Sequence, residues 1–201
     1  MFSRTLQRSY TLMAPLYDRI VATATQTARQ RSLALLEPNI QNGNILLAGI
    51  GTGLDISYLP KGAHYTGIDL THAMLKRAQK QITTSNINLH QGDIMQLPYP
   101  DEFFEVVIMH LILAVVPFSQ QALDEATRVL VPDGKILILD KFLKPHQKAP
   151  LRRFLNPVIS KIATRTNVVF EELEHPTLTV VSNTPALMNG WFRHILLRKN
   201  G

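Results

Sequence analysis

The chain has 201 residues, of which 45% are hydrophobic and 18% are charged, and it contains no cysteine. This composition is that of one soluble globular domain and excludes a disordered chain. The lack of cysteine excludes disulfides, thiolate zinc sites and thiol nucleophiles, and it fits a cytoplasmic protein. The longest apolar stretch, residues 106–118, is interrupted by His110 and is too short to span a bilayer. The segment MFSRTLQRSYTLMAP has no apolar core of signal-peptide length.

Apolar runs typical of strands alternate with helical patterns along the chain. Helices are predicted over 15–36, over a segment that begins with 54–59, over 72–84 behind the N-cap Thr71, and over 119–130. Strands are predicted over 44–49, 64–69, 87–91, 104–110, 135–140, 177–182 and 191–198, with a turn at Pro132-Asp133-Gly134. This alternation predicts an α/β fold. It is a Rossmann-like, doubly wound, mostly parallel seven-stranded sheet with helices on both faces and a site at the carboxyl ends of the strands.

The net charge of +6 is unevenly distributed. Residues 1–36 contain five Arg and one Asp, and residues 141–170 contain seven Lys or Arg and no acid. Two basic segments therefore flank a mildly acidic centre. This asymmetry indicates an anionic partner or surface, with solvated helix faces as the alternative.

A glycine-rich turn, Gly49, Gly51 and Gly53, separates the first predicted strand from the segment that follows. Such a turn lets backbone approach a ligand closely. Asp69 lies 20 positions after Gly49, at the end of the next strand, where a carboxylate can accept both ribose hydroxyls of a nucleoside. Taken singly, the glycines could form a plain turn and Asp69 could cap a helix. Their joint spacing predicts a nucleoside site, and the absence of G-K-[ST] excludes a P-loop.

Four segments in order resemble the successive motifs of class I S-adenosylmethionine-dependent methyltransferases. They are LLAGIGTG, YTGIDLTHAMLKRAQ, INLHQGDIMQLPYPDEFFEVVIMHLIL and EATRVLVPDGKILILD, and they cover about residues 45–140. The subgroup that they resemble most contains quinone-biosynthesis and bacterial phosphatidylethanolamine N-methyltransferases. The segment APLYDRI is similar to the tyrosine-aspartate element of the helix that covers the cofactor in these enzymes.

The resemblance implies a site for S-adenosyl-L-methionine, with S-adenosyl-L-homocysteine as product. The glycine turn would meet the methionine portion, Asp69 the ribose, and Asp93 the adenine amino group. His110 would face the methyl-bearing sulfur or the acceptor, and Tyr17 would close over the cofactor, so His110 and Tyr17 are the expected catalytic residues. The cofactor-binding residues implied in this way are Tyr17, Ala48, Gly49, Gly51, Gly53, Asp69, Leu70, Gly92, Asp93, Ile94, Met109 and His110. No metal ligands are expected.

The chain departs from the family pattern at two positions. Leu47 stands where the family usually has an acidic residue near the ammonium end of the cofactor, and Glu105 replaces the more usual Asp. Backbone carbonyls near Ala48 and Gly49, or the side chain of Asp18, are candidates to replace the missing acid. The loss of the acid at position 47 bears on the ammonium contact and the cofactor affinity, whereas Glu105 is the milder change.

One methyltransferase domain is expected over residues 1–201. Its parts are cofactor-covering helices in 1–40, the cofactor-binding core in 45–140, a basic acceptor-side insertion in 141–175 and the final strands in 176–201. Within the insertion, apolar residues recur at helical intervals among Lys and Arg, which predicts reversible association of 141–166 with an anionic membrane surface. Packing of this stripe on the sheet, with solvated cations, is the alternative.

Methyl transfer from a sulfonium needs an in-line nucleophile about 3–3.5 Å away and little else from side chains. An amine acceptor need only be neutral, whereas a hydroxyl needs a base, for which His110 and His146 are candidates beside a purely packed or surface role.

Three functions stay open at this point. The leading one is a methyltransferase for a small amphiphilic or lipid-like acceptor, such as phosphatidylethanolamine or a quinone precursor. The second is an RNA or protein methyltransferase, with nucleic acid disfavoured because few aromatic residues accompany the cations of 141–170. The third is a noncatalytic cofactor-binding module. The expected location is the cytoplasm, including the inner face of the membrane.

Overall fold

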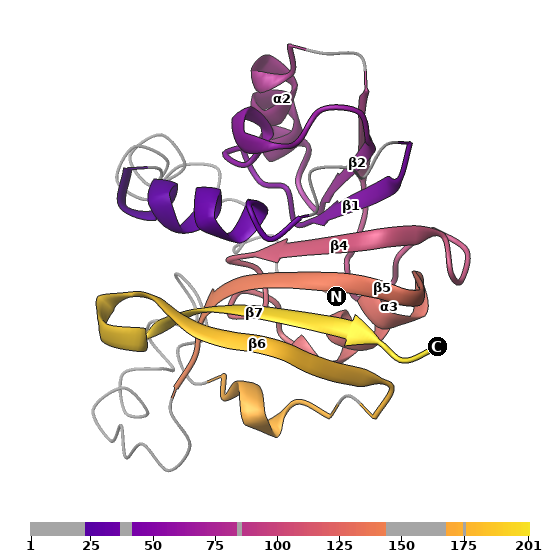
Figure 1. The fold of residues 1–201 in the computed structure, drawn as a ribbon. Helices are drawn as coiled ribbons and strands as arrows, with labels where there is room; N and C mark the ends of the chain where they lie inside the picture. The colour runs from indigo at the N-terminus through magenta and orange to yellow at the C-terminus, as the bar shows by residue number, and fades with distance from the viewer. Residues whose placement is uncertain (1–22, 37–41, 84–85, 144–167, 175) are drawn as a thin grey trace.

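Seven strands form one sheet in the computed structural model, which describes residues 23–36, 42–83, 86–143, 168–174 and 176–201 (Figure 1). The strand order is β3-β2-β1-β4-β5-β7-β6. The first five strands run parallel to their neighbours, and β7 runs antiparallel to both β5 and β6. The bounds are β1 Asn44–Ala48, β2 His64–Asp69, β3 Ile87–Gln91, β4 Phe104–His110, β5 Leu130–Lys141, β6 Leu178–Leu187 and β7 Phe192–Lys199. The predicted α/β class and the mostly parallel sheet are confirmed.

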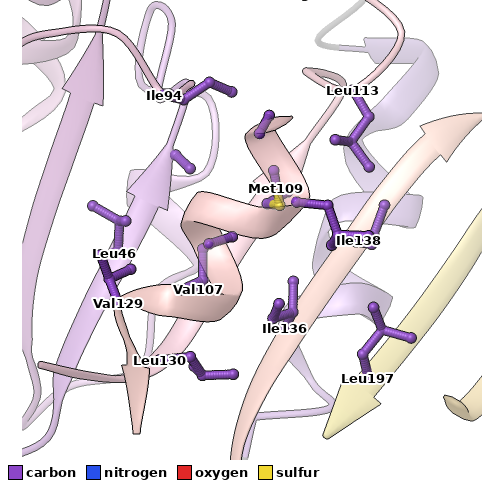
Figure 2. Close-up of a cluster of buried hydrophobic side chains, with 14 of the residues drawn as sticks. Leu46, Ile94, Val107, Met109, Leu113, Val129, Leu130, Ile136, Ile138 and Leu197 are labelled. Carbon is purple, nitrogen blue, oxygen red and sulfur yellow. The ribbon is translucent and has the colours of Figure 1, made fainter. Parts of the chain in front are cut away.

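Helices cover both faces of this sheet. On one face, α3 (Ser119–Arg128) packs on an apolar cluster that contains Met109, part of which Figure 2 shows. On the other face, the helix of residues 23–33 and α2 (His72–Gln81) pack on a second cluster, which contains Leu47. The central strands are therefore buried on both faces, which explains why their sequences are continuous apolar runs instead of alternating ones.

The helix predicted from residue 54 is wrong, because only a single 3-10 turn, η1 (Ile56–Tyr58), forms there. Leu59 has extended backbone, with φ −67° and ψ 135°, and Pro60 follows it. The ring of a proline disfavours helical backbone in the residue before it, so the helix cannot continue.

The boundaries of β5 and α2 also differ from the predictions. β5 begins at Leu130 and runs through the predicted turn, where Asp133 adopts a φ of 61° and the register with β4 shifts. α2 ends at Gln81, three residues before the predicted end. The turn residues thus produce an irregularity inside a longer strand.

Several predictions concern residues that the structure does not describe. Tyr17, Asp18 and His146 lie outside the described residues, as do residues 144–167, which form most of the predicted basic insertion. Of the predicted helix over 15–36, residues 23–33 are helical and 15–22 are not described. Within the described ranges, no helix has the length and apolar character needed to cross a membrane.

Asp140, near the carboxyl end of β5, carries a buried carboxyl group. Its oxygens accept the backbone N–H groups of Ala114, at 3.1 Å, and of Lys141, at 2.8 Å. Burial raises the pKa of Asp140 to about 6, although these N–H groups act in the opposite direction. The bond to Ala114 ties the chain that follows β4 to the end of β5.

Replacing Asp140 with asparagine should remove a pH dependence of stability. The pKa of Asp140 is about 6 in the folded state against 3.8 unfolded, so the protonated acid stabilises the fold at low pH. This contribution is lost as the pH rises through about 6. The free energy of unfolding of the wild type, relative to Asp140→Asn, should fall by about 2 kcal/mol between about pH 4 and about pH 7.

Urea unfolding at the two pH values measures this difference. Asp124→Asn, at an exposed position on α3, is the control and should show no such change. The same difference between wild type and Asp140→Asn at both pH values would contradict the account of Asp140.

Candidate functional site

β1 is paired in parallel with β2 on one side and with β4 on the other. From β1 the chain continues through β2 and β3 on one side of β1, and it then crosses to β4 on the other side. The direction of the chain across the sheet therefore changes between β1 and β4. In open α/β sheets, ligands bind outside the carboxyl ends of the strands at this change of direction. The residues that follow β1, β2 and β3, together with the end of β4, therefore define the candidate site.

The glycine turn directly follows β1. Gly49, Gly51 and Gly53 have φ values of 78°, 58° and 83°, which side chains other than glycine rarely adopt. A Cβ at Gly49 would lie 2.6 Å from the Ile112 side chain, and one at Gly53 would lie 3.0 Å from the Cα of Ala78. A Cβ at Gly51 would meet nothing within 4 Å. The outer two glycines are thus required by packing, while Gly51 presents its backbone to open space.

Asp69, the last residue of β2, lies beside this turn. One of its carboxylate oxygens accepts the N–H of Gly51 at 3.0 Å, and the other accepts the N–H and the hydroxyl of Thr71, at 2.9 and 3.0 Å. Burial raises the pKa of Asp69, while these donors lower it. A carboxylate has about four acceptor positions, and three of them are already used. Two ribose hydroxyls could therefore both bind only if they shared one position or displaced one of the three donors.

Thr71 occupies the N-cap position of α2, as predicted, but its side chain makes no capping bond. Its hydroxyl is donated to Asp69 instead. The residue that begins the helix therefore holds the carboxylate of the candidate site in place.

The segment after β3 is joined to Asp69 through the backbone. The N–H of Gly92 donates to the carbonyl of Asp69 at 3.0 Å. Asp93 is half-buried, and one of its oxygens accepts the N–H of Met95 at 2.9 Å. The structure thus brings Gly51, Asp69, Gly92 and Asp93 to the same edge of the sheet.

Three of the predicted cofactor contacts lie less directly at this edge. Ile94 and Met109 are buried in the apolar cluster on the α3 face, where Figure 2 labels both. Leu70 is half-buried, and its carbonyl accepts a bond from the side chain of Gln91 at 3.1 Å. Ile94 and Met109 are therefore part of the buried core next to the candidate site.

His110, the last residue of β4, belongs to a buried polar network. Its Nδ1 lies 3.0 Å from the carboxylate of Asp55, and its Nε2 lies 2.9 Å from the hydroxyl of Ser32. The other oxygen of Asp55 accepts a bond of 2.8 Å from Arg29, whose Nε donates to Thr25 at 3.0 Å. Both ring nitrogens of His110 thus have buried partners.

The charge of Asp55 is balanced inside the protein. Burial alone would raise the pKa of this carboxyl, but His110 and Arg29 outweigh that effect and hold it well below its usual range. Asp55 is therefore ionised and acts only as an acceptor.

The sequence predictions did not identify Arg29, Ser32 or Asp55. One signal was available, because Asp55 is the single charged residue in ILLAGIGTGLDISYLP, residues 45–60. Its partners lie on other elements, 26 and 55 positions away. The residues next to Asp55 in the sequence do not predict its pairing with these distant residues.

The two departures from the family pattern lie in different places. Leu47 is 2% exposed inside the apolar cluster beneath the helix of residues 23–33. Glu105 is exposed and accepts the N–H of Asn44, the first residue of β1. Glu105 therefore lies at the opposite end of the strands from the candidate site.

Residues 46–138 match the sequence profile of the methyltransferase domain family. The chain is 28% identical to a phosphatidylethanolamine N-methyltransferase of Cereibacter sphaeroides, over 96% of this chain and 97% of that protein. It is 30% identical to a demethylmenaquinone methyltransferase of Lactobacillus johnsonii, over 94% of this chain and 85% of that protein. Among solved structures, an S-adenosylmethionine-dependent methyltransferase of Thermotoga maritima has a TM-score of 0.70 at 18% identity, covering 97% of this chain and all of that one.

The sheet order, the glycine turn and these matches define a class I methyltransferase fold. The chain belongs to the S-adenosylmethionine-dependent methyltransferases, and within them it is similar to the subgroup of quinone-biosynthesis and phosphatidylethanolamine enzymes. It is an enzyme whose cofactor is S-adenosylmethionine.

The carboxyl edge fits this cofactor. Gly51 leaves open space where a side chain would otherwise stand, and the carboxylate of Asp69 lies next to it. A polar acceptor beside an open stretch of backbone is what a ribose attached to an amino-acid chain requires.

Asp69→Ala should weaken binding of S-adenosylhomocysteine by roughly 1–3 kcal/mol, because the ribose hydroxyls lose a charged acceptor. Calorimetric titration measures the change. Asp124→Ala, an exposed residue on α3, should bind like the wild type. Wild-type affinity in Asp69→Ala would remove Asp69 from the site.

Leu47→Glu should lower the free energy of unfolding by about 3 kcal/mol or more, because it places a carboxylate in an apolar cluster without partners. Leu47→Met, which keeps the volume, should cost less than about 1.5 kcal/mol. Urea unfolding of both variants tests this. A stable Leu47→Glu variant with improved cofactor affinity would show that position 47 faces the ammonium group.

Proposed function

We propose that the enzyme methylates a small, amphiphilic, lipid-like acceptor. A phospholipid amine such as phosphatidylethanolamine is the first candidate, and a quinone precursor is the second. The observation that carries the proposal is the similarity along nearly the full length of both chains to a phosphatidylethanolamine N-methyltransferase. Similarity over the whole length includes the acceptor-side segments that differ between methyltransferases, and not only the shared cofactor core.

In this proposal the cofactor lies along the carboxyl edge. The backbone of Gly49, Gly51 and Gly53 meets its methionine portion, Asp69 accepts from the ribose, and Asp93 accepts from the adenine amino group. The sulfonium of the bound cofactor supplies an activated methyl group, so the protein's task is to orient the acceptor and exclude water. Tyr17 stays proposed as a residue that closes over the cofactor.

The bonding of His110 favours an amine acceptor over a hydroxyl. A hydroxyl needs a base, and Nε2 of His110 can accept its proton only after the bond to Ser32 opens. An amine that arrives neutral makes no such demand. With both ring nitrogens bonded to protein groups, His110 is therefore better suited to shaping the site than to taking a proton from the acceptor.

An apolar tip lies at the same edge of the sheet as the carboxyl ends (Figure 1). Leu187, Met188, Trp191 and Phe192 form the tip of the β6–β7 hairpin, and Met188 is 66% exposed. The N–H of Phe142 donates to the carbonyl of Trp191 at 3.0 Å, so the hairpin tip is fixed beside the start of the basic segment. Apolar and aromatic residues beside cations suit an anionic membrane interface, from which a lipid acceptor would enter.

Transfer of a radiolabelled methyl group from S-adenosylmethionine tests the proposed acceptor class. Vesicles containing phosphatidylethanolamine, a demethylated quinol, total RNA and a protein mixture are offered separately, with Asp69→Ala as the control of weakened cofactor binding. Label should enter the organic extract of the vesicles or of the quinol. Label found only in RNA or protein would overturn the lipid-like acceptor.

The chain contains a single tryptophan, which allows membrane association to be measured directly. Vesicles with anionic lipid should shift the emission of Trp191 to shorter wavelength and should carry the protein into the pellet. Neutral phosphatidylcholine vesicles should do neither, and raised salt should reverse the effect because exposed charges are screened.

Arg152→Glu combined with Arg153→Glu, in the basic segment outside the described residues, should abolish sedimentation while cofactor affinity is unchanged. Lys61→Glu combined with Arg198→Glu makes the same change of charge at exposed positions near the amino ends of β2 and β5, and should retain binding. Equal binding to anionic and neutral vesicles, or none to either at low salt, would contradict membrane delivery.

A further inference from the structure

Asp55 connects three separate parts of the chain at the cofactor edge. It lies two positions after Gly53 of the glycine turn, and its carboxylate binds Arg29 on the helix of residues 23–33 and His110 at the end of β4. Both ion-pair partners have side chains less than 10% exposed. The carboxylate is therefore a buried junction between the turn, the helix and the strand.

Asp55 also determines where the proton of His110 lies. An ionised carboxylate can only accept, so Nδ1 of His110 must carry the hydrogen of their 3.0 Å bond. In the neutral ring Nε2 is then an acceptor, and it receives the hydroxyl hydrogen of Ser32. Position and tautomer of the imidazole are thus both set by the carboxylate.

The same helix is held at one further point by a polar bond, and a second bond orients Arg29 within the helix. The guanidinium of Arg29 also donates to Thr25 on its own helix, which fixes its direction. His194 of β7 donates from Nε2 to the carbonyl of Ala28 at 2.8 Å. Apolar contacts of Leu33, and of Leu36 just beyond the end of the helix, already attach this segment to the sheet.

A buried ion pair gives little or no stability compared with apolar side chains of similar size. Ser32 and Asp55 are each followed in the sequence by a member of the buried apolar cluster on this face, Leu33 and Ile56 respectively. Stability alone therefore does not account for the network, whereas a requirement for one fixed geometry does.

We propose that Asp55 is a positioning residue of the cofactor site, which holds the glycine turn, the helix of residues 23–33 and the imidazole of His110 in one arrangement. The inference rests on the proposed placement of the cofactor along that turn. It makes cofactor affinity depend on a residue that touches the cofactor only through others.

The test combines binding of S-adenosylhomocysteine with nitrogen NMR of ring-labelled histidine. Asp55→Asn should raise the dissociation constant about tenfold or more, and the His110 signal should lose its single Nδ1–H form. The His110 signal is assigned by its disappearance in His110→Gln. Leu33→Ala is the matched control, because it loosens the same helix through its apolar contacts. It should lower the melting temperature, keep the dissociation constant within about twofold and keep the Nδ1–H form.

Wild-type affinity and an unchanged Nδ1–H form in Asp55→Asn would overturn the proposal and leave a structural ion pair. Failure of the wild type to bind S-adenosylhomocysteine would overturn the placement of the cofactor instead. If Asp55→Asn does not fold, Ser32→Ala decides the matter. The Nδ1–H form should persist in that variant. A change to the Nε2–H form would show that Ser32, and not Asp55, determines the tautomer of His110.

Discussion

The parallel pairing of β1 with β2 on one side and β4 on the other is the constraint on which the site depends. Parallel strands end at the same edge, so this pairing brings the glycine turn, Asp69 and His110 to one edge of the sheet. The register matches Ala48 with Ile68, which places Asp69 one residue beyond the last paired position of β1. The bond from Gly51 to Asp69 follows from that register.

The polar groups at the amino edge and at the carboxyl edge of the sheet are arranged differently. At the amino edge, polar side chains join neighbouring segments. Glu105 accepts the N–H of Asn44, and Arg128 donates to Glu125, to Asp101 and to two backbone carbonyls. At the carboxyl edge, the N–H of Gly51 donates to Asp69, and a Cβ at Gly51 would meet nothing within 4 Å. Polar bonds of Asp140 and Asp55 fix the carboxyl edge as well, and they leave the place beside Gly51 open.

The sequence predicted the strands well, because strands buried on both faces must be continuous apolar runs. It also predicted that the glycine turn and Asp69 would belong to one site, and the structure joins Gly51 and Asp69 by a hydrogen bond. The short turn at Ile56–Tyr58 was missed because the effect of Pro60 on Leu59 outweighs a helical pattern of only a few residues. The ion pair of Arg29 with Asp55 could not be foreseen, since it depends on how the helix of residues 23–33 crosses the sheet.

Hydrogen exchange in the presence of S-adenosylhomocysteine tests most directly whether the cofactor lies along this edge. Binding should slow exchange of backbone amides in residues 49–53, 69–71 and 92–95, which end the three neighbouring strands β1, β2 and β3. Amides at the amino edge, in residues 60–64 and 130–135, should exchange as in the free protein. Protection confined to the amino edge, or no protection at the glycine turn under saturating ligand, would contradict the account.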